Sequence, residues 1–179
     1  MNLTEALTDL IASPGPHLIA IDGPAGSGKS TLAKELFLYF SINREVNLLG
    51  LDDIYDGWNN ALGEKLTKNL KLIANAHAAK SSISVNIYDW HASAYADVRE
   101  IKAKDILIIE GVGSAQPVIR AHGAITIWMD IDPEHGVKRV LERDGNHIAK
   151  EMILWQELQM QHFLESGARE NADFIITTE

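Results

Sequence analysis

Cysteine is absent from this chain of 179 residues. Its absence excludes disulfide bonds, a thiol nucleophile and any zinc site that needs thiolate ligands. No stretch approaches the roughly 20 consecutive apolar residues of a membrane-spanning helix. The first residues also lack the basic segment and apolar run of a secretory signal. We therefore expect a cytoplasmic protein that contacts no membrane.

Positive charge is also scarce, with 16 Lys and Arg against 25 Asp and Glu and a formal net charge of −9. The basic residues form no dense run, which argues against a nucleic-acid partner, because a phosphate backbone is held by clustered Lys and Arg. Zinc is not expected either, since no histidine pair has ligand spacing next to a helix carboxylate. A small anionic ligand remains compatible, because backbone dipoles can supply a local positive field.

One glycine-rich stretch, residues 23–31, reads GPAGSGKST and matches the phosphate-binding loop pattern G-x-x-x-x-G-K-[ST] at every position. In this pattern the glycines let backbone N–H groups turn toward phosphate oxygens, the lysine reaches the β- and γ-phosphates, and the hydroxyl faces Mg²⁺. We expect a nucleoside triphosphate, ATP, to be bound by Gly23, Ala25, Gly26, Ser27, Gly28, Lys29, Ser30 and Thr31.

The context of this loop is the one that the motif requires. Residues 17–22 are typical of a buried strand that leads into the loop, and apolar residues recur at helical spacing after it, at Leu32, Leu36, Phe37 and Phe40. Such a helix directs its N-terminal dipole at the phosphates.

Strand and helix patterns alternate along the rest of the chain. Further strands are predicted at 45–51, 105–111, 125–131 and 174–178, with helices over 62–77, from 132 and over 148–166. A short leading helix is expected within 1–13, and a hairpin at about 83–101, with 97–101 returning across a turn at 91–94. The alternation predicts one α/β domain over 1–179, a P-loop NTPase three-layer sandwich with a mainly parallel sheet of about five strands.

Acidic residues stand at two predicted strand ends, where ligands sit in open parallel sheets. Glu110 ends the most apolar strand and, with Ser30, is a candidate magnesium ligand. Asp52 and Asp53 follow another strand, and on an extended chain only one of them can face the triphosphate. That one carboxylate would accept the proton of an attacking hydroxyl. Solvent-facing acids are the alternative interpretation.

Arg139 and Arg143 lie four residues apart, on one face of a predicted helix, in a short lid around 139–147. Two guanidinium groups on one face can hold a transferring phosphoryl group. Glu142 and Asp144 are neighbours, so a solvated ion-pair face would look similar.

Four aromatic residues, Trp58, Tyr88, Trp90 and Tyr95, cluster near the region expected to bind the acceptor. Their rings either stack on a nucleobase or pack in the core. His77 shares a predicted helix face with apolar residues and is expected to be a packing histidine.

At these residues the chain resembles the uridine kinase family of P-loop nucleoside and small-metabolite kinases, over about residues 18–163. Asp52-Asp53-Ile54-Tyr55 stands where the family has an Asp-Ser-Phe-Tyr-like motif, which implies that Asp52 is the base. Tyr88-Asp89 resembles a pair on a hairpin that closes over the nucleoside, and Glu110-Gly111 resembles a strand end of the family. The resemblance thus implies an acceptor side that includes Tyr55, Tyr88 and Asp89, to which the aromatic cluster adds Trp58.

The chain also departs from the family. Its lid is reduced to Glu142-Arg143-Asp144-Gly145, and His91 follows Asp89 by only two residues. The loop alone resembles cytidylate kinases. We expect an ATP- and Mg²⁺-dependent kinase that phosphorylates a hydroxyl of a small acceptor, a nucleoside first of all. A cytidylate-type nucleoside monophosphate kinase and a non-catalytic ATP-binding protein are the alternatives. Related kinases often form homo-oligomers.

Overall fold

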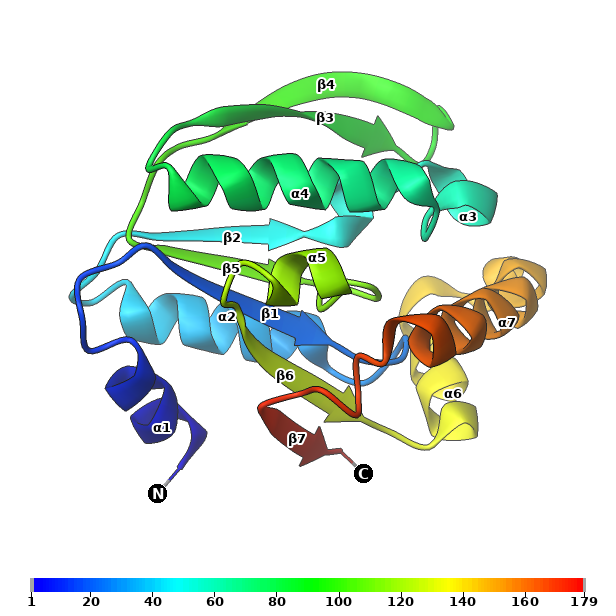
Figure 1. Cartoon of the computed structure of the whole chain (residues 1–179). Coiled ribbons are helices and arrows are strands. Elements are labelled where there is room, and N and C mark those ends of the chain that lie inside the picture. Colours follow the sequence, from blue (N-terminus) through cyan, green and yellow to red (C-terminus); the bar gives the residue numbers. More distant parts are fainter. Residues whose placement is uncertain (1, 179) are drawn as a thin grey trace.

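A central five-stranded sheet organises the protein, which is seen in a computed structural model that describes residues 2–178. The strand order is β2-β5-β1-β6-β7, and every neighbouring pair is parallel. The bounds are β1 (His17–Asp22), β2 (Val46–Gly50), β5 (Ile106–Glu110), β6 (Ile125–Asp130) and β7 (Phe174–Thr177). The predicted fold class is therefore confirmed, and the strand that leads into the phosphate loop lies in the middle of the sheet (Figure 1).

Helices cover both faces of this sheet, which makes three layers (Figure 1). One face carries α1 (Leu3–Leu10) and α2 (Lys29–Phe40), and the other carries α4 (Glu64–Ala78) and α5 (Pro117–Arg120). Side chains of β5 alternate between the two cores: Ile106 and Ile108 face α2, whereas Leu107 and Ile109 face α4. A strand buried on both faces needs such an unbroken apolar run.

Beyond the carboxyl ends of the strands lie α6 (Pro133–Asp144), η2 (Asn146–Ile148) and α7 (Ala149–Ser166) (Figure 1). The turn η1 (Leu51–Asp53) and the short α3 (Gly57–Asn60) follow β2 at the same edge. The segment expected to be a lid, 139–147, thus comprises the end of α6, Gly145 and the start of η2. In parallel α/β sheets this edge is the usual place of the ligand site.

An antiparallel hairpin, β3 (Ile83–Asp89) and β4 (Ala94–Ile101), lies on the outer side of α4 (Figure 1). The return strand begins at Ala94, three residues earlier than the expected 97, and the turn covers 90–93. The turn is tightened because the Asp89 carboxylate accepts hydrogen bonds from the amides of His91 (2.8 Å) and Ala92 (3.0 Å).

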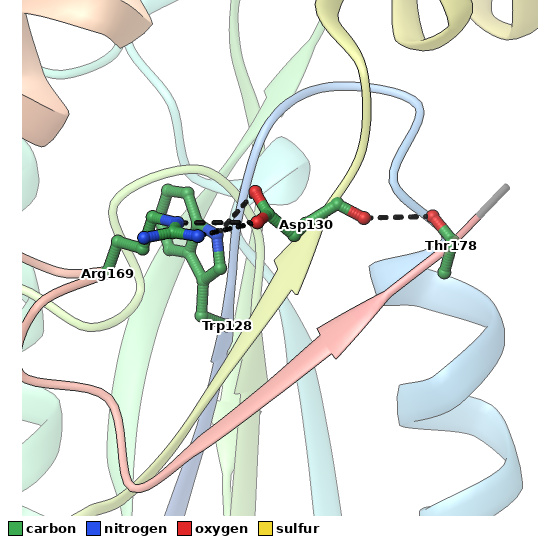
Figure 2. A network of polar contacts seen from close by, with 4 residues as sticks. All are labelled: Trp128, Asp130, Arg169 and Thr178. Carbon is green, nitrogen blue, oxygen red and sulfur yellow. Dashed lines mark hydrogen bonds and ion pairs between the residues drawn. The ribbon is translucent and has the colours of Figure 1, made fainter.

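The end of β7 is fastened beside the phosphate loop by a polar network around Asp130 (Figure 2). The Asp130 carboxylate accepts hydrogen bonds from Arg169 Nη2 at 2.9 Å and from Trp128 Nε1 at 3.1 Å. The Thr178 hydroxyl lies 3.2 Å from the Asp130 carbonyl oxygen and 3.3 Å from the Ser27 carbonyl oxygen. Thr178, the last described residue, thereby bridges β6 and the phosphate loop. Across residues 2–178, no helix has the length and apolar character needed to cross a membrane.

Candidate active site

The phosphate loop has a backbone that only glycine accommodates at its critical points. Gly23, Gly26 and Gly28 all have positive φ angles, of 139°, 81° and 92°. A Cβ on Gly26 would overlap the carbonyl oxygen of Gly136, because α6 packs directly on the loop there. Gly28 precedes α2, whose first N–H groups have no partner within the helix. The loop therefore presents a helix N-terminus to an anion.

Lys29 is buried at the centre of the site. Its ammonium group donates hydrogen bonds to the carbonyl oxygens of Gly23 (2.8 Å) and Pro24 (2.7 Å). Burial lowers the pKa of Lys29, while the carboxylates of Asp22, Glu110 and Asp52 act in the opposite direction. The cation thus lies among three acids, two of which the sequence had already placed at the site.

Asp22, which the sequence analysis did not single out, is fully buried between the phosphate loop and the loop after β5. Its Oδ1 accepts hydrogen bonds from the amides of Gly23 (2.7 Å) and Gly113 (2.9 Å), and its Oδ2 from the amide of Ala115 (2.9 Å). Burial raises the pKa of Asp22, although these bonds and Lys29 lower it. An acid at the end of an apolar strand, directly before the glycine, was the signal that could have revealed it.

Helix α7 also reaches the phosphate loop. The amide of Ala25 donates to Oε1 of Gln159 at 3.0 Å, and the Gln159 side chain is buried. Two amides of the loop, those of Gly23 and Ala25, are therefore engaged by side chains of the protein itself. Ala25 and Gln159 are separated by 134 residues, so no local pattern could have predicted their contact.

Glu110 and Ser30, the predicted magnesium ligands, lie together. A hydrogen bond from the Ser30 hydroxyl and the charge of Lys29 lower the pKa of Glu110, but burial is the larger effect and raises it. In residues 2–178 no three His, Cys, Asp or Glu side chains are grouped to hold a metal ion. A carboxylate and a hydroxyl at one point nevertheless suit Mg²⁺, which binds few protein oxygens and completes its shell with phosphate and water.

The two candidate bases differ in what they face. The expectation of an extended chain at Asp52 and Asp53 is wrong: they lie in the 3₁₀ turn η1, closed by a bond from the Ile54 amide to the Leu51 carbonyl oxygen. The Asp52 side chain keeps solvent access, yet the surrounding protein raises its pKa by desolvation, against the lowering effects of Lys29 and Arg143. Asp53 instead forms an ion pair with Arg99 of β4 at 2.6 Å.

The two arginines of α6 reach different parts of the site. Arg139 lies with Nη1 at 3.4 Å from the Gly26 carbonyl oxygen in the phosphate loop. Arg143 is held by its neighbour Asp144 through two hydrogen bonds, Nε to Oδ1 at 2.7 Å and Nη2 to Oδ2 at 2.6 Å. Its charge acts on both Lys29 and Asp52. The structure thus shows the ion pair of Arg143 with Asp144, and the phosphoryl clamp stays a prediction.

Tyr55 does not line an accessible surface, contrary to the expected contact with the acceptor. Its side chain is only 1% exposed, and its hydroxyl donates to the Val112 carbonyl oxygen at 2.7 Å. Its ring packs against Trp155 of α7, with centroids 5.6 Å apart. Burial of the ring between the loop after β5 and α7 makes Tyr55 a packing residue behind the site.

The other acceptor candidates form a continuous aromatic cluster. Trp58 contacts Trp90 (5.2 Å between centroids) and Trp155 (5.9 Å), and Tyr88 contacts Trp90 (5.2 Å) and Tyr95 (5.3 Å). The four residues predicted to lie in this region are partly exposed, whereas Trp155, which was not predicted, is buried. The cluster joins the hairpin to α3 and α7. His77 packs as expected, buried with Nε2 at 2.8 Å from the His17 carbonyl oxygen.

Known proteins resemble this chain over most of its length. A uridine kinase of Clostridium novyi (strain NT) is 33% identical over 146 residues, 72% of this chain and 68% of the relative. A uridine kinase of Clostridium botulinum (strain Kyoto / Type A2) is 31% identical over 185 residues, 90% of this chain and 87% of the relative. No protein-family model matches the chain.

Solved structures resemble the fold. A protein described as a possible uridine kinase from Bacillus stearothermophilus superposes with a TM-score of 0.69 at 17% identity, over 97% of this chain and 96% of the other. Shikimate kinase from Acinetobacter baumannii superposes with a TM-score of 0.55 at 16% identity, over 98% and 88%. At such low identity these two likenesses show the architecture alone.

Proposed function

This chain belongs to the uridine kinase family and is a phosphotransferase with an alcohol group as acceptor; on that premise we propose that it transfers the γ-phosphoryl group of ATP, with Mg²⁺, to a hydroxyl of a nucleoside. The observation that carries the proposal is the position of Asp52. Asp52 lies in the turn η1 directly after β2, at the carboxyl edge of the sheet, and the charges of Lys29 and Arg143 both act on its carboxylate.

The donor half of the site consists of the loop and its lysine. We assign the phosphates of ATP to Lys29 and to the loop amides other than those of Gly23 and Ala25, which donate to Asp22 and Gln159. The present partners of Lys29 are two carbonyl oxygens of its own loop. Because Lys29 is buried, its charge acts in a poorly solvated site, where electrostatic stabilisation of developing negative charge is strongest. Arg139 and Arg143 are the proposed partners of the migrating phosphoryl group.

Ser30 and Glu110 are the residues that would hold Mg²⁺. Their hydroxyl and carboxylate already face one another, and an oxygen-only donor pair fits a hard cation. Bound there, the ion would neutralise charge on the phosphate oxygens.

We assign Asp52 as the general base of the chemical step. The acceptor oxygen forms a bond to the γ-phosphorus while the bond from that phosphorus to the β–γ bridging oxygen breaks, and ADP leaves. Asp52 takes the proton of the acceptor hydroxyl, which leaves neutral Asp52 and a phosphate ester. Asp53 is not assigned this role, because its carboxylate is paired with Arg99.

The acceptor half is assigned to the aromatic cluster. The partly exposed faces of Trp58 and Tyr88 offer flat apolar surfaces beside the turn that carries Asp52. Stacking on such rings suits a planar base. Asp89 is assigned to shaping the hairpin turn, since its carboxylate accepts two amides of that turn.

A panel of acceptors with ATP and Mg²⁺ tests the proposal, scored by ADP release above the background without acceptor. We expect uridine or another nucleoside to raise ADP release and to yield a nucleoside monophosphate. Turnover with nucleoside monophosphates instead would favour a cytidylate-type kinase. ATP binding without turnover on any nucleoside, sugar or vitamin would mean a non-catalytic nucleotide-binding protein.

A further inference from the structure

The residue after the proposed base faces the hairpin. Asp53 Oδ2 lies 2.6 Å from Nη1 of Arg99, which is on β4 and 46 residues away in sequence. Neither side chain is enclosed: 40% of the Asp53 side chain and 49% of the Arg99 side chain are exposed. The short distance thus reflects a specific contact between the η1 turn and the hairpin, since no surrounding core forces these two groups together.

Other hairpin side chains bind the same short segment through its backbone. Trp90 Nε1 donates to the Asp52 carbonyl oxygen at 2.8 Å. The Tyr95 hydroxyl lies 3.3 Å from the Tyr55 carbonyl oxygen and 3.4 Å from that of Ile54. The segment 52–55 is thereby bound at consecutive residues by three side chains of the hairpin. Of these contacts, only the one between Asp53 and Arg99 joins two side chains of opposite charge.

We propose that Asp53 and Arg99 form a latch that holds the η1 turn against the hairpin, so that both act as positioning residues for the Asp52 carboxylate. The inference rests on the proposed function, because it takes Asp52 as the base. Asp52 and Asp53 are neighbours on a tight turn, so a rotation of that turn moves both carboxylates together. Fixing Asp53 on the hairpin therefore fixes the direction in which Asp52 points.

Loss of the pair between Asp53 and Arg99 should affect the orientation of the Asp52 carboxylate more than the stability of the fold. Exposed ion pairs contribute little to folding stability, so loss of this pair should leave the protein folded. Displacement of a reacting group by about 1 Å, in contrast, can cost on the order of 10²-fold in rate. The latch thus predicts variants that fold normally, bind ATP normally and turn over slowly.

Four variants test the latch. Arg99→Ala and Asp53→Asn remove one partner, Arg99→Lys keeps the charge, and the exchange Asp53→Arg with Arg99→Asp restores an inverted pair. Glu100→Gln is the matched control, because Glu100 is the exposed neighbour of Arg99 on β4 and points to the other side of the strand. The measurements are kcat, KM for ATP, and hydrogen exchange of the Ile54 and Tyr55 amides, which close the turn onto the Leu51 carbonyl oxygen.

We expect Arg99→Ala and Asp53→Asn to lower kcat about tenfold with KM for ATP unchanged, and to speed exchange of both amides. Arg99→Lys and the exchanged pair should recover kcat to within about threefold of the wild type, and Glu100→Gln should change nothing. Unchanged exchange in Arg99→Ala, or faster exchange with an unchanged kcat, would overturn the latch. If the wild type shows no acceptor-dependent turnover, the proposed function fails, and the exchange data alone still decide whether the pair holds the turn.

Discussion

Asp22 accepts a hydrogen bond from the Ala115 amide at 2.9 Å, which ties the end of β1 to the loop that follows β5. The same carboxylate also holds the amides of Gly23 and Gly113, so both loops share one buried acceptor. Because the Gly23 amide opens the phosphate loop, Asp22 keeps that loop in register with the neighbouring strand.

We predict that Asp22→Asn lowers the free energy of unfolding by about 1–3 kcal/mol, since the new amide group would direct N–H donors at the Ala115 N–H. Chemical denaturation measures this loss. Asp9→Asn, an exposed acid of α1, is the control and should stay within about 0.5 kcal/mol of the wild type. A loss no larger than that of the control would contradict the role of Asp22.

The pH dependence of the same comparison has a definite sign. Burial raises the pKa of Asp22 above its ordinary 3.8, so the folded state binds this proton more tightly than the unfolded state. The Asp22 contribution to stability is therefore greatest below pH 3.8 and declines as the pH rises through the folded-state pKa. We expect the difference in unfolding free energy between wild type and Asp22→Asn to shrink as the pH rises through that window. A difference that grows would contradict the raised pKa.

Asp52→Asn should lower kcat by about 10²–10⁴-fold while ATP affinity is spared, because the amide cannot accept the proton of the acceptor hydroxyl. Asp53→Asn is the comparison, and the latch predicts a loss of only about tenfold there. Steady-state kinetics with ATP and the best acceptor of the panel measure both. Equal losses, or the larger loss at Asp53, would reverse the assignment of the base.

The acid limb of the pH–rate profile should lie above the ordinary Asp pKa of 3.8, because desolvation raises the pKa of Asp52. Activity requires the ionised carboxylate, so activity falls as the pH drops through the raised pKa of Asp52. Arg143 lowers the pKa of Asp52, and Arg143→Ala should therefore move the limb to higher pH, besides lowering the rate. An acid limb at the same pH in Arg143→Ala and in the wild type would show that the charge of Arg143 does not act on the pKa of the base.

Lys29→Ala should lower turnover by at least about 10²-fold and weaken ATP binding, since the buried charge that faces the phosphates is lost. Calorimetric titration with ATP and Mg²⁺ measures the affinity. Lys34→Ala, an exposed lysine on the next turn of α2, is the control. Unchanged affinity and turnover in Lys29→Ala would refute a nucleotide site at this loop.

Asp144→Asn should lower kcat by about tenfold, because an amide cannot accept both hydrogen bonds of the Arg143 guanidinium and leaves that fork poorly oriented. Glu142→Gln, whose carboxylate pairs only with Lys138 at 3.9 Å among the described contacts, should leave kcat unchanged. A faster Asp144→Asn enzyme would show instead that Asp144 competes with the phosphoryl group for Arg143.

The elements around the phosphate loop were largely predictable because their signals are local. The loop motif, the strand before it and the helix after it depend on residues within 17–40, and the structure places these elements at His17–Asp22 and Lys29–Phe40. The long apolar run of β5 likewise predicted a strand buried on both faces. Glycine positions and hydrophobic spacing determine structure over a few residues, so these elements can be predicted from the sequence directly.

The remaining features depend on partners that are remote in sequence. Gln159 meets Ala25, and Arg99 meets Asp53, only after the sheet and the hairpin have formed. The strand order is a property of the whole chain in the same way. The error at Asp52 and Asp53 had a local cause, since the chain after β2 closes a 3₁₀ turn instead of continuing the strand. Tyr55 was misplaced because aromatic residues serve equally in pockets and cores.

The most direct test of the account is the identity of the product formed from ATP, Mg²⁺ and uridine, followed by ³¹P NMR with wild type and Asp52→Asn. We predict that the wild type converts uridine to its monophosphate with one ADP per ester formed, and that the variant does so at least about 10²-fold more slowly. ADP formation with inorganic phosphate alone, or phosphorylation only of a nucleoside monophosphate, would contradict it.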